Sequence, residues 1–495
     1  MLFNSYIFIL FFLPLCLVVY FLLNKFKLYK TGLVFLTGMS LWFYGFSNPS
    51  YLPVICGSII VNYLIYFFMS KMSERKNKKI LMILGVVFNL GLLGYFKYVD
   101  FFIENVNAMF KQDMRLLKIA LPLGISFFTF QQISFVVDAY KGEVGKCNFL
   151  EYASFVSYFP QLVAGPIVSH DEILPQLRDQ SKKLPLWKNL SMGFFVFTLG
   201  LAKKMLIADT FGKMVDEGYI TVINVMNYGG QSINTVEAVL ICLAYAFQLY
   251  FDFSGYCDMA IGIAKMMNIE LPLNFDSPYK SANAGEFWKR WHMTLNRFLT
   301  KYVYIPLGGS RKGIAITCIN TLLVFFMSGL WHGASWGFVI WGLINGLCVV
   351  LYRLCRKVID KIPHVITCLC TFLMYAFSLI FFRAEKVSVA IAFIKRMFSF
   401  EFGTINPKLY EGFEFPEFEK VFSVLPVEKY AAIICLVIFF VLAFIMVFFC
   451  KNSVQQMKQM EERKPKIFNA VLLAVLFVWC IVSLGEVSTF LYFNF

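Results

Sequence analysis

The chain has 495 residues, of which 59% are hydrophobic and 15% charged, and its apolar runs of about 20 residues have the length that an α-helix needs to cross a bilayer. This composition leaves no visible soluble domain and predicts an all-α multi-pass membrane protein. The formal net charge is +15, but the basic residues collect in short loops between apolar runs. The positive-inside rule explains this distribution, so the charge does not indicate nucleic acid as a partner.

The N-terminal part, residues 1–110, is predicted to hold the first four spans. The first apolar run has no basic residue ahead of it and no small-residue cleavage site after it, so we expect a retained span and not a signal peptide. Basic residues follow the first and third runs, which predicts an extracytoplasmic N-terminus. The four predicted spans are residues 2–23, 31–46, 51–69 and 80–98.

Prolines, glycines, two glutamines and Asp138 interrupt the hydropathy between residues 120 and 166. Such residues are tolerated at membrane depth only where they face protein or a water-filled cavity. We therefore expect short, tilted or re-entrant helices that line a cavity. The alternative is two ordinary spans joined by a loop.

Spans at 190–207 and 236–251 follow, and the second runs directly into Asp252. A carboxylate at the edge of an apolar span is costly unless it is paired. Asp252 is therefore a candidate member of a polar site or, equally, the structural partner of a neighbouring arginine.

An amphipathic helix at the membrane surface is predicted for residues 286–304. Trp288, Trp291, His292 and Leu295 share one face of this helix, at i, i+3, i+4 and i+7. A second face is basic, and the basic character continues into a glycine-containing loop. Its members are Arg290, Arg297, Lys301 and, in the loop, Arg311. These residues either bind a phosphorylated, anionic cofactor or anchor the chain under the positive-inside rule.

His332 lies within the apolar run 314–341. A histidine in a membrane segment is rare and usually faces the protein interior or an aqueous path. Gly329 and Gly333 flank it, and we expect them to leave the backbone open to a substrate. An imidazole with an ordinary pKa can take a proton from a hydroxyl near neutral pH, which suits general-base catalysis. The alternative is a structural histidine.

The C-terminal part, residues 353–495, is predicted to carry spans and one polar outer loop at about 383–429, too long for a tight connection. The basic loops between these spans predict an extracytoplasmic C-terminus. The last four predicted spans are residues 341–352, 366–382, 430–449 and 468–484.

Six ordered motifs extend through the chain and together resemble the membrane-bound O-acyltransferase family, in particular its alginate O-acetyltransferase-like bacterial branch. The motifs are PQLVAGP (160–166), YFDFSGY (250–256), NF with PY (274–279), FW with RWH (287–292), YIPLGG (304–309) and GLWHG (329–333).

The resemblance implies a single acyltransferase domain over residues 1–495, in which tilted and re-entrant helices form a ring around a central tunnel. Its core, residues 111–352, would hold the active site. His332 would be the catalytic residue and His292 the second characteristic polar residue. The expected lining of the tunnel is Trp331, Trp288, Trp291, Asp252, Ser328 and Asn296.

The reaction implied is transfer of an acetyl group from cytoplasmic acetyl-coenzyme A to an exported polysaccharide, either alginate-like or peptidoglycan, in the bacterial cytoplasmic membrane. The basic residues named above would contact the donor phosphates, and neither a permanently bound cofactor nor a metal is expected. His292, a tryptophan N–H or a backbone amide beside Gly329 or Gly333 would stabilise the tetrahedral oxyanion.

An extracytoplasmic SGNH-type acetyltransferase is the partner that the resemblance implies. The aromatic tail of the chain contains Tyr492, which either anchors at the membrane interface or relays the acyl group to such a partner. Two other functions stay open at this point. One is a D-alanyl transferase for teichoic acid that uses an acyl carrier protein, and the other is a transporter without covalent chemistry.

Overall fold

The computed structural model describes residues 1–415, 430–462, 467–485 and 489–491. Every regular element in these residues is helical, which confirms the predicted all-α class. The chain divides into two compact units. The first unit consists of residues 1–201, 256–273 and 457–495, and the second of residues 202–255 and 274–456.

Within the described residues, 10 helical runs are long and apolar enough to cross a membrane. Each coincides with a predicted span, and the predicted span 31–46 is a helix of 17 residues, α2 (Tyr29–Gly45). The protein is therefore a multi-pass membrane protein. The 10 runs are Ile7–Lys25, Pro49–Lys71, Arg75–Phe110, Trp187–Tyr228, Thr235–Met266, Gly313–His332, Trp336–Ile359, His364–Arg383, Ala431–Phe448 and Ile467–Gly485.

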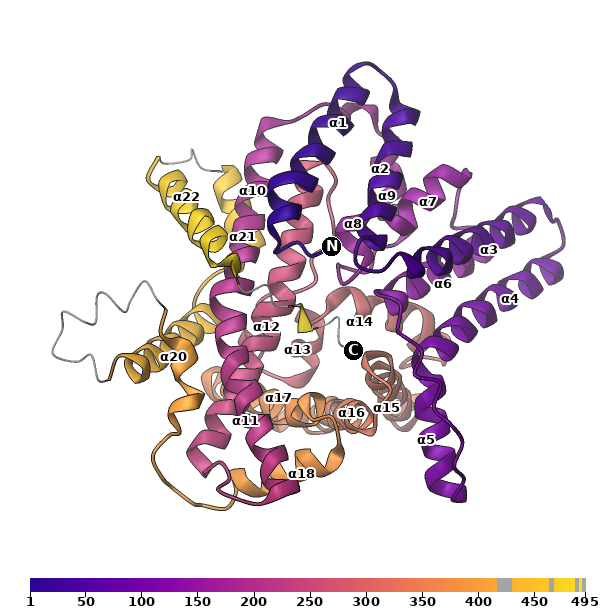
Figure 1. Cartoon of the computed structure of the whole chain (residues 1–495). Helices are drawn as coiled ribbons and strands as arrows, with labels where there is room; N and C mark the ends of the chain where they lie inside the picture. Colours follow the sequence, from indigo (N-terminus) through magenta and orange to yellow (C-terminus); the bar gives the residue numbers. More distant parts are fainter. Residues whose placement is uncertain (416–429, 463–466, 486–488, 492–495) are drawn as a thin grey trace. The chain divides into compact units, whose positions relative to one another are not determined.

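The first unit contains the N-terminal spans and two C-terminal helices. In it α3, α4 and α6 pack against one another (Figure 1). Its elements are η1 (Ile7–Phe12), α1 (Leu13–Lys25), α2, η2 (Pro49–Tyr51), α3 (Leu52–Lys71), α4 (Arg75–Leu93), η3 (Gly94–Tyr98), α5 (Val99–Phe110), α6 (Ile125–Lys141), α7 (Phe149–Ser157), α8 (Phe159–Leu162), α9 (His170–Arg178), η4 (Gln180–Lys182), α10 (Trp187–Ala202), the end of α12, most of α21 (Ser453–Glu462), α22 (Ile467–Val482) and η11 (Ser483–Gly485).

The interrupted region at 120–166 forms the short helices α6, α7 and α8, as predicted. Its glutamines, however, bond to protein. Gln132 donates to the Ser58 hydroxyl at 2.9 Å and accepts from the Tyr152 hydroxyl at 3.1 Å, while Gln131 donates to the Phe155 carbonyl at 2.9 Å. These buried amides are therefore satisfied by helix-to-helix hydrogen bonds, as apolar surroundings require. That these helices are re-entrant stays a prediction.

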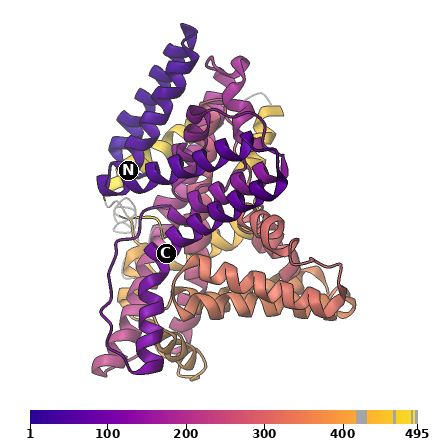
Figure 2. The same cartoon turned by 90° about the vertical axis from the view of Figure 1, so that its right-hand side faces the viewer.

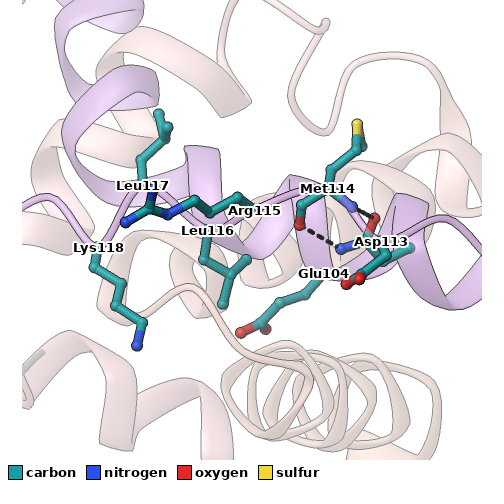
Figure 3. Close-up of a pocket in the computed structure, with 8 residues that line it drawn as sticks. Glu104, Asp113, Met114, Arg115, Leu116, Leu117 and Lys118 are labelled. Atoms are coloured by element: carbon teal, nitrogen blue, oxygen red, sulfur yellow. Dashed lines mark hydrogen bonds between the residues drawn. The ribbon is translucent and has the colours of Figure 1, made fainter.

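A hollow of about 710 Å³ lies where α5 meets the loop that follows it (Figure 3). The Asp100 carboxylate accepts the backbone N–H groups of Leu117 and Lys118 at 2.7 and 2.8 Å. Asn107 exchanges two hydrogen bonds with the backbone of Met114. These bonds hold the loop on the helix, and no predicted site residue lines the hollow. Its lining is Glu104, Asn107, Asp113, Met114, Arg115, Leu116, Leu117 and Lys118.

The second unit contains all the described residues that the sequence assigned to the active site. Its helices α15 and α16 run side by side over most of their length, as the salmon-coloured pair in Figure 2 shows. Its elements are η5 (Lys203–Ala208), α11 (Asp209–Tyr228), most of α12 (Thr235–Met266), η6 (Pro278–Lys280), α13 (Ala284–Arg290), α14 (Met293–Leu299), η7 (Thr300–Tyr304), α15 (Gly313–His332), α16 (Trp336–Ile359), α17 (His364–Arg383), α18 (Val387–Met397), η8 (Pro407–Leu409), η9 (Glu411–Phe413) and α20 (Ala431–Phe448).

Glycines allow the close approach of α15 and α16. A Cβ atom at Gly342 would collide with the carbonyl oxygen of Phe325, and one at Gly346 would lie 2.8 Å from the Phe325 Cβ. Small residues of this kind let helix backbones approach where apolar lipid provides no driving force for association. The pair holds the end of α15, where His332 lies, against α16.

The predicted loop at 383–429 is partly folded. It begins with α18 and continues through η8 and η9, all of which contact α11. The backbone N–H of Asn406 donates to the Glu237 carboxylate at 2.7 Å. Residues 416–429 lie outside the described part of the chain, and the side of the membrane on which this segment lies stays a prediction.

Candidate active site

The predicted continuous helix at 286–304 is wrong. The chain forms α13, then leaves helical geometry at Trp291 and His292, and resumes as α14 and η7. His292 has φ 46° and ψ 51°, the left-handed region, which costs a non-glycine residue about 1–2 kcal/mol. Because of this break, Trp288, His292 and Leu295 do not lie on one continuous helix, as the prediction required.

A loop segment, residues 274–276, is hydrogen-bonded to both sides of this break. The Asp276 N–H donates to the Arg290 carbonyl at 2.9 Å, and the Met293 N–H donates to the Asn274 carbonyl at 3.0 Å. These bonds use backbone groups that the interruption of the helix leaves without intrahelical partners. The sequence gives little warning of the break, because residues 284–304 contain good helix formers and a helical apolar pattern.

The His292 ring is buried, with a residue exposure of 1%, and its centroid lies 4.9 Å from that of Phe253 and 5.7 Å from that of Trp331. Its Nδ1 atom lies 3.2 Å from Oδ1 of Asn274. Burial disfavours the charged form and lowers the pKa of His292 to about 3. The imidazole is therefore neutral at physiological pH.

His332 is the last residue of α15 and has a residue exposure of 4%. Its ring centroid lies 5.0 Å from those of Trp331 and Trp341 and 5.3 Å from that of Phe382. The apolar run 314–341 thus covers nearly all of α15 and the start of α16, and the chain leaves helical geometry between them. Gly333 and Ser335, residues common at helix ends, were the available sequence signal.

The centroids of the His292 and His332 rings lie 6.2 Å apart, and Trp331 contacts both rings. The structure thus brings together the two histidines that the sequence singled out, although they are 40 positions apart in the chain. An imidazole in such an aromatic enclosure, here His332 beside the neutral His292, can accept a proton from a reacting group and return it.

The glycines beside His332 do not leave the backbone open, contrary to the prediction. A Cβ atom at Gly329 would collide with the carbonyl oxygen of Phe338, and one at Gly333 would collide with the Phe338 ring. At both glycines, the space that a side chain would take is filled by atoms of Phe338. The small size of the two glycines allows α15 to approach the start of α16.

Tryptophans form much of the wall around the histidine pair. The Trp288 and Trp341 rings lie 5.7 Å apart, and the Trp291 ring lies 5.0 Å from that of Tyr375. The indole N–H groups of Trp288 and Trp341 are buried and have no hydrogen-bond partner within the described residues. The sequence predicted Trp288, Trp291 and Trp331 in this site but missed Trp341 and Phe382, which α16 and α17 contribute.

Asn296 and Ser328, which were also predicted to line the tunnel, lie close to the histidine pair in the sequence of their helices. Asn296 donates from its side chain to the Trp288 carbonyl at 2.8 Å, and so ties α14 to α13 across the break. Ser328 is buried on α15, one turn before His332.

Asp252 is paired with a lysine, so the structure answers the question that the sequence left open. Lys204 Nζ lies 2.7 Å from Oδ1 of Asp252 and 2.8 Å from Oδ1 of Asp209. The Lys204 side chain is only 2% exposed. Buried charges of this kind persist only where opposite charges and hydrogen bonds compensate for lost hydration. The lysine pair at 203–204, inside an apolar run, was the sequence signal for this partner.

The predicted basic residues differ in their surroundings. Arg290 bonds to the Glu286 carboxylate at 2.9–3.0 Å and lies 3.9 Å from that of Asp276. Arg297 and Arg311 are exposed, and Lys301 lies 5.2 Å above the Tyr302 ring.

Two other predictions concern metals and the C-terminal tail. No group of three or more potential metal ligands occurs among the residues that the structure describes, and none of the 13 cysteines forms a disulfide there. Tyr492 lies outside the described residues.

Comparison with known proteins connects this geometry to a chemistry. A family model described as MBOAT, membrane-bound O-acyltransferase family, matches residues 9–387. The chain is 38% identical to a peptidoglycan O-acetyltransferase of Helicobacter pylori, over 100% of this chain and 98% of the relative. It is 36% identical to a probable alginate O-acetylase, AlgI, of Pseudomonas aeruginosa over 81% of this chain and 75% of the relative. A teichoic acid D-alanyltransferase of Bacillus subtilis is 28% identical over 48% of this chain and 60% of its own length.

Lys204→Met should lower the free energy of unfolding by about 3–5 kcal/mol, because it leaves the buried Asp252 carboxylate and the partly buried Asp209 carboxylate without their cation. Thermal unfolding in detergent would show this as a lower midpoint than that of Lys188→Met, which removes an exposed lysine. The double variant Lys204→Met, Asp252→Asn should recover part of the loss. An unchanged midpoint for Lys204→Met would contradict the structural role of the ion pair.

Proposed function

The chain belongs to the membrane-bound O-acyltransferase family and is an acyltransferase, and we propose that it acetylates peptidoglycan from acetyl-coenzyme A. The observation that carries this proposal is the match to a peptidoglycan O-acetyltransferase over 100% of this chain. The alginate O-acetylase of Pseudomonas aeruginosa matches over 81%, and the Bacillus subtilis D-alanyltransferase over 48%. A cell-envelope glycan acetylated on oxygen is therefore favoured over teichoic acid as the acceptor. A transporter without covalent chemistry is not supported.

The histidine pair supports a general-base mechanism. His332 takes the proton of the acceptor hydroxyl, which is that of the Tyr492 relay or of the sugar itself, while the hydroxyl oxygen attacks the acetyl carbon of the thioester. The tetrahedral intermediate collapses by breaking the carbon–sulfur bond, and the proton on His332 passes to the leaving thiolate. A thioester is already activated, so positioning of the two reactants and stabilisation of the oxyanion account for most of the required catalysis.

The aromatic enclosure gives this proton transfer a suitable environment. A general acid–base residue typically contributes 10²- to 10⁴-fold to a rate, and exclusion of water prevents hydrolysis of the thioester. Because the two residues are 1% and 4% exposed, donor and acceptor have to reach the rings through a protein-lined passage or one that opens on binding. The predicted tunnel would provide that passage.

The donor is proposed to arrive from the cytoplasm and the acceptor from the outer face of a bacterial cytoplasmic membrane, with both chain termini outside. Exposed Arg297 and Arg311, together with Lys301, suit contacts with coenzyme A phosphates. Arg290 suits this role less well because two carboxylates already lie beside it. An extracytoplasmic SGNH-type partner, with Tyr492 as acyl relay, completes the proposed transfer.

His332→Ala should lower peptidoglycan O-acetylation by about 100-fold or more, because it removes the general base. The measurement is mass spectrometry of muropeptides from cells that lack other O-acetyltransferases and express equal membrane amounts of each variant. His364→Ala, which removes an exposed histidine, is the matched control and should leave acetylation unchanged. Normal acetylation by His332→Ala would exclude His332 as the base, and wild-type cells without O-acetyl groups would refute the function itself.

Arg311→Ala should raise the KM for acetyl-coenzyme A by about tenfold with little change in kcat, because a hydrogen bond to a charged group contributes about 1.5–3 kcal/mol. Initial rates with purified protein in liposomes would measure both constants. Arg353→Ala removes another exposed arginine of the same unit and should leave KM unaltered. Equal KM values for the two variants would remove Arg311 from the donor site.

A further inference from the structure

The side chain of Asn274 converges with His292 and Thr294 inside the second unit. Asn274 is fully buried, with a residue exposure of 0%. Its Oδ1 atom lies 3.2 Å from the Thr294 backbone nitrogen, 2.9 Å from the Thr294 hydroxyl and 3.2 Å from His292 Nδ1. One amide atom therefore faces three potential donors.

The Thr294 backbone settles which atom of the amide faces this cluster. Asn oxygen and nitrogen are assigned from their hydrogen-bond partners, and a backbone N–H can only donate. The Asn274 atom beside it must therefore be the oxygen. The opposite orientation of the amide would place two donors face to face in a buried site, which is costly.

The assignment of this oxygen fixes the proton of the His292 ring. An amide oxygen only accepts, so His292 Nδ1 must carry a hydrogen and donate it. Burial keeps the ring neutral, because it lowers the pKa of His292 to about 3. A neutral imidazole has one proton, so Nε2 carries the lone pair and acts as an acceptor.

The backbone around His292 holds the ring in this orientation. The Met293 N–H donates to the Asn274 carbonyl, so that Asn274 bonds to three consecutive residues through its main chain and side chain. His292 occupies a left-handed conformation that another residue type would adopt at lower cost, since asparagine and glycine tolerate it best. His292 thus keeps a strained backbone conformation, and that conformation places its imidazole in a defined orientation.

We infer that Asn274 is a positioning residue that holds the proton of His292 on Nδ1 and so makes Nε2 a hydrogen-bond acceptor in acyl transfer. This inference rests on the proposed function and narrows it. His292 then accepts a hydrogen bond, from the acceptor hydroxyl or from a donor on His332, and does not donate to the oxyanion. The oxyanion donor is left to another group, such as the Trp341 indole N–H or a backbone amide.

Nitrogen-15 NMR of the full chain, labelled at histidine and held in nanodiscs, tests the inference without reference to activity. The chain has only four histidines, and His292→Gln identifies the signals of that ring by their loss. Wild type should show a protonated Nδ1 and an unprotonated Nε2. Asn274→Asp should keep this pattern because a carboxylate accepts the same three bonds, whereas Asn274→Ala should shift the proton wholly or partly to Nε2. A wild-type ring protonated on Nε2, or an unchanged ring in Asn274→Ala, would overturn the inference.

Acetylation rates of the same variants test whether the orientation of the ring matters to the reaction. Asn274→Ala should lower kcat by about 100-fold, with the KM for acetyl-coenzyme A within about twofold, and Asn274→Asp should restore most of the rate. Thr294→Val removes one bond to the same oxygen without affecting the ring proton, and should keep near wild-type kcat. Full activity in Asn274→Ala, or an equal loss in Thr294→Val, would refute the positioning role. A wild-type protein that transfers no acetyl group would instead refute the proposed function, while the NMR result on the ring proton would stand.

Discussion

The cost of burying a polar ring among aromatic side chains governs the candidate active site. An imidazole removed from water stays neutral, and each of its nitrogens needs a defined role. At His292, Nδ1 lies within hydrogen-bond distance of Asn274, and the ring centroid lies 6.2 Å from that of His332. The break between α13 and α14 and the loop residues 274–276 together create this arrangement.

The surrounding helices keep the two rings together. Glycines at 329, 333 and 342 bring α15 and α16 into contact, and the end of α15 carries His332. In the same unit, Lys204 compensates Asp252 one position before Phe253, whose ring contacts His292. A buried ion pair contributes little net stability in itself, yet loss of one partner is costly.

The sequence was sufficient to predict the helical class and the membrane spans, because apolar run length is a strong signal in a membrane protein. It also singled out two histidines that the structure brings together, because polar residues are rare in such a chain. It was insufficient at Trp291 and His292, where the apolar residues follow a helical pattern but the helix is broken. The hydrogen bonds that Asn274 accepts from Met293 and Thr294, and the one that Asp276 donates to Arg290, come from a segment remote in the sequence. The sequence also misassigned Gly329, because a small residue serves helix contact and substrate approach equally well on sequence grounds. The ion pair between Lys204 and Asp252 could not be predicted either, because the spacing of residues in the sequence does not show which side chains meet in the folded chain.

The central claim is that His292 and His332 act as one unit in acyl transfer. A double-mutant cycle on coenzyme A thiol release by the purified protein in liposomes tests it most directly, since residues that act together give strongly non-additive losses. The account predicts that His292→Ala and His332→Ala each slow thiol release, and that the double variant is no slower than the slower single variant. Losses that multiply in the double variant, or single variants as fast as wild type, would contradict it.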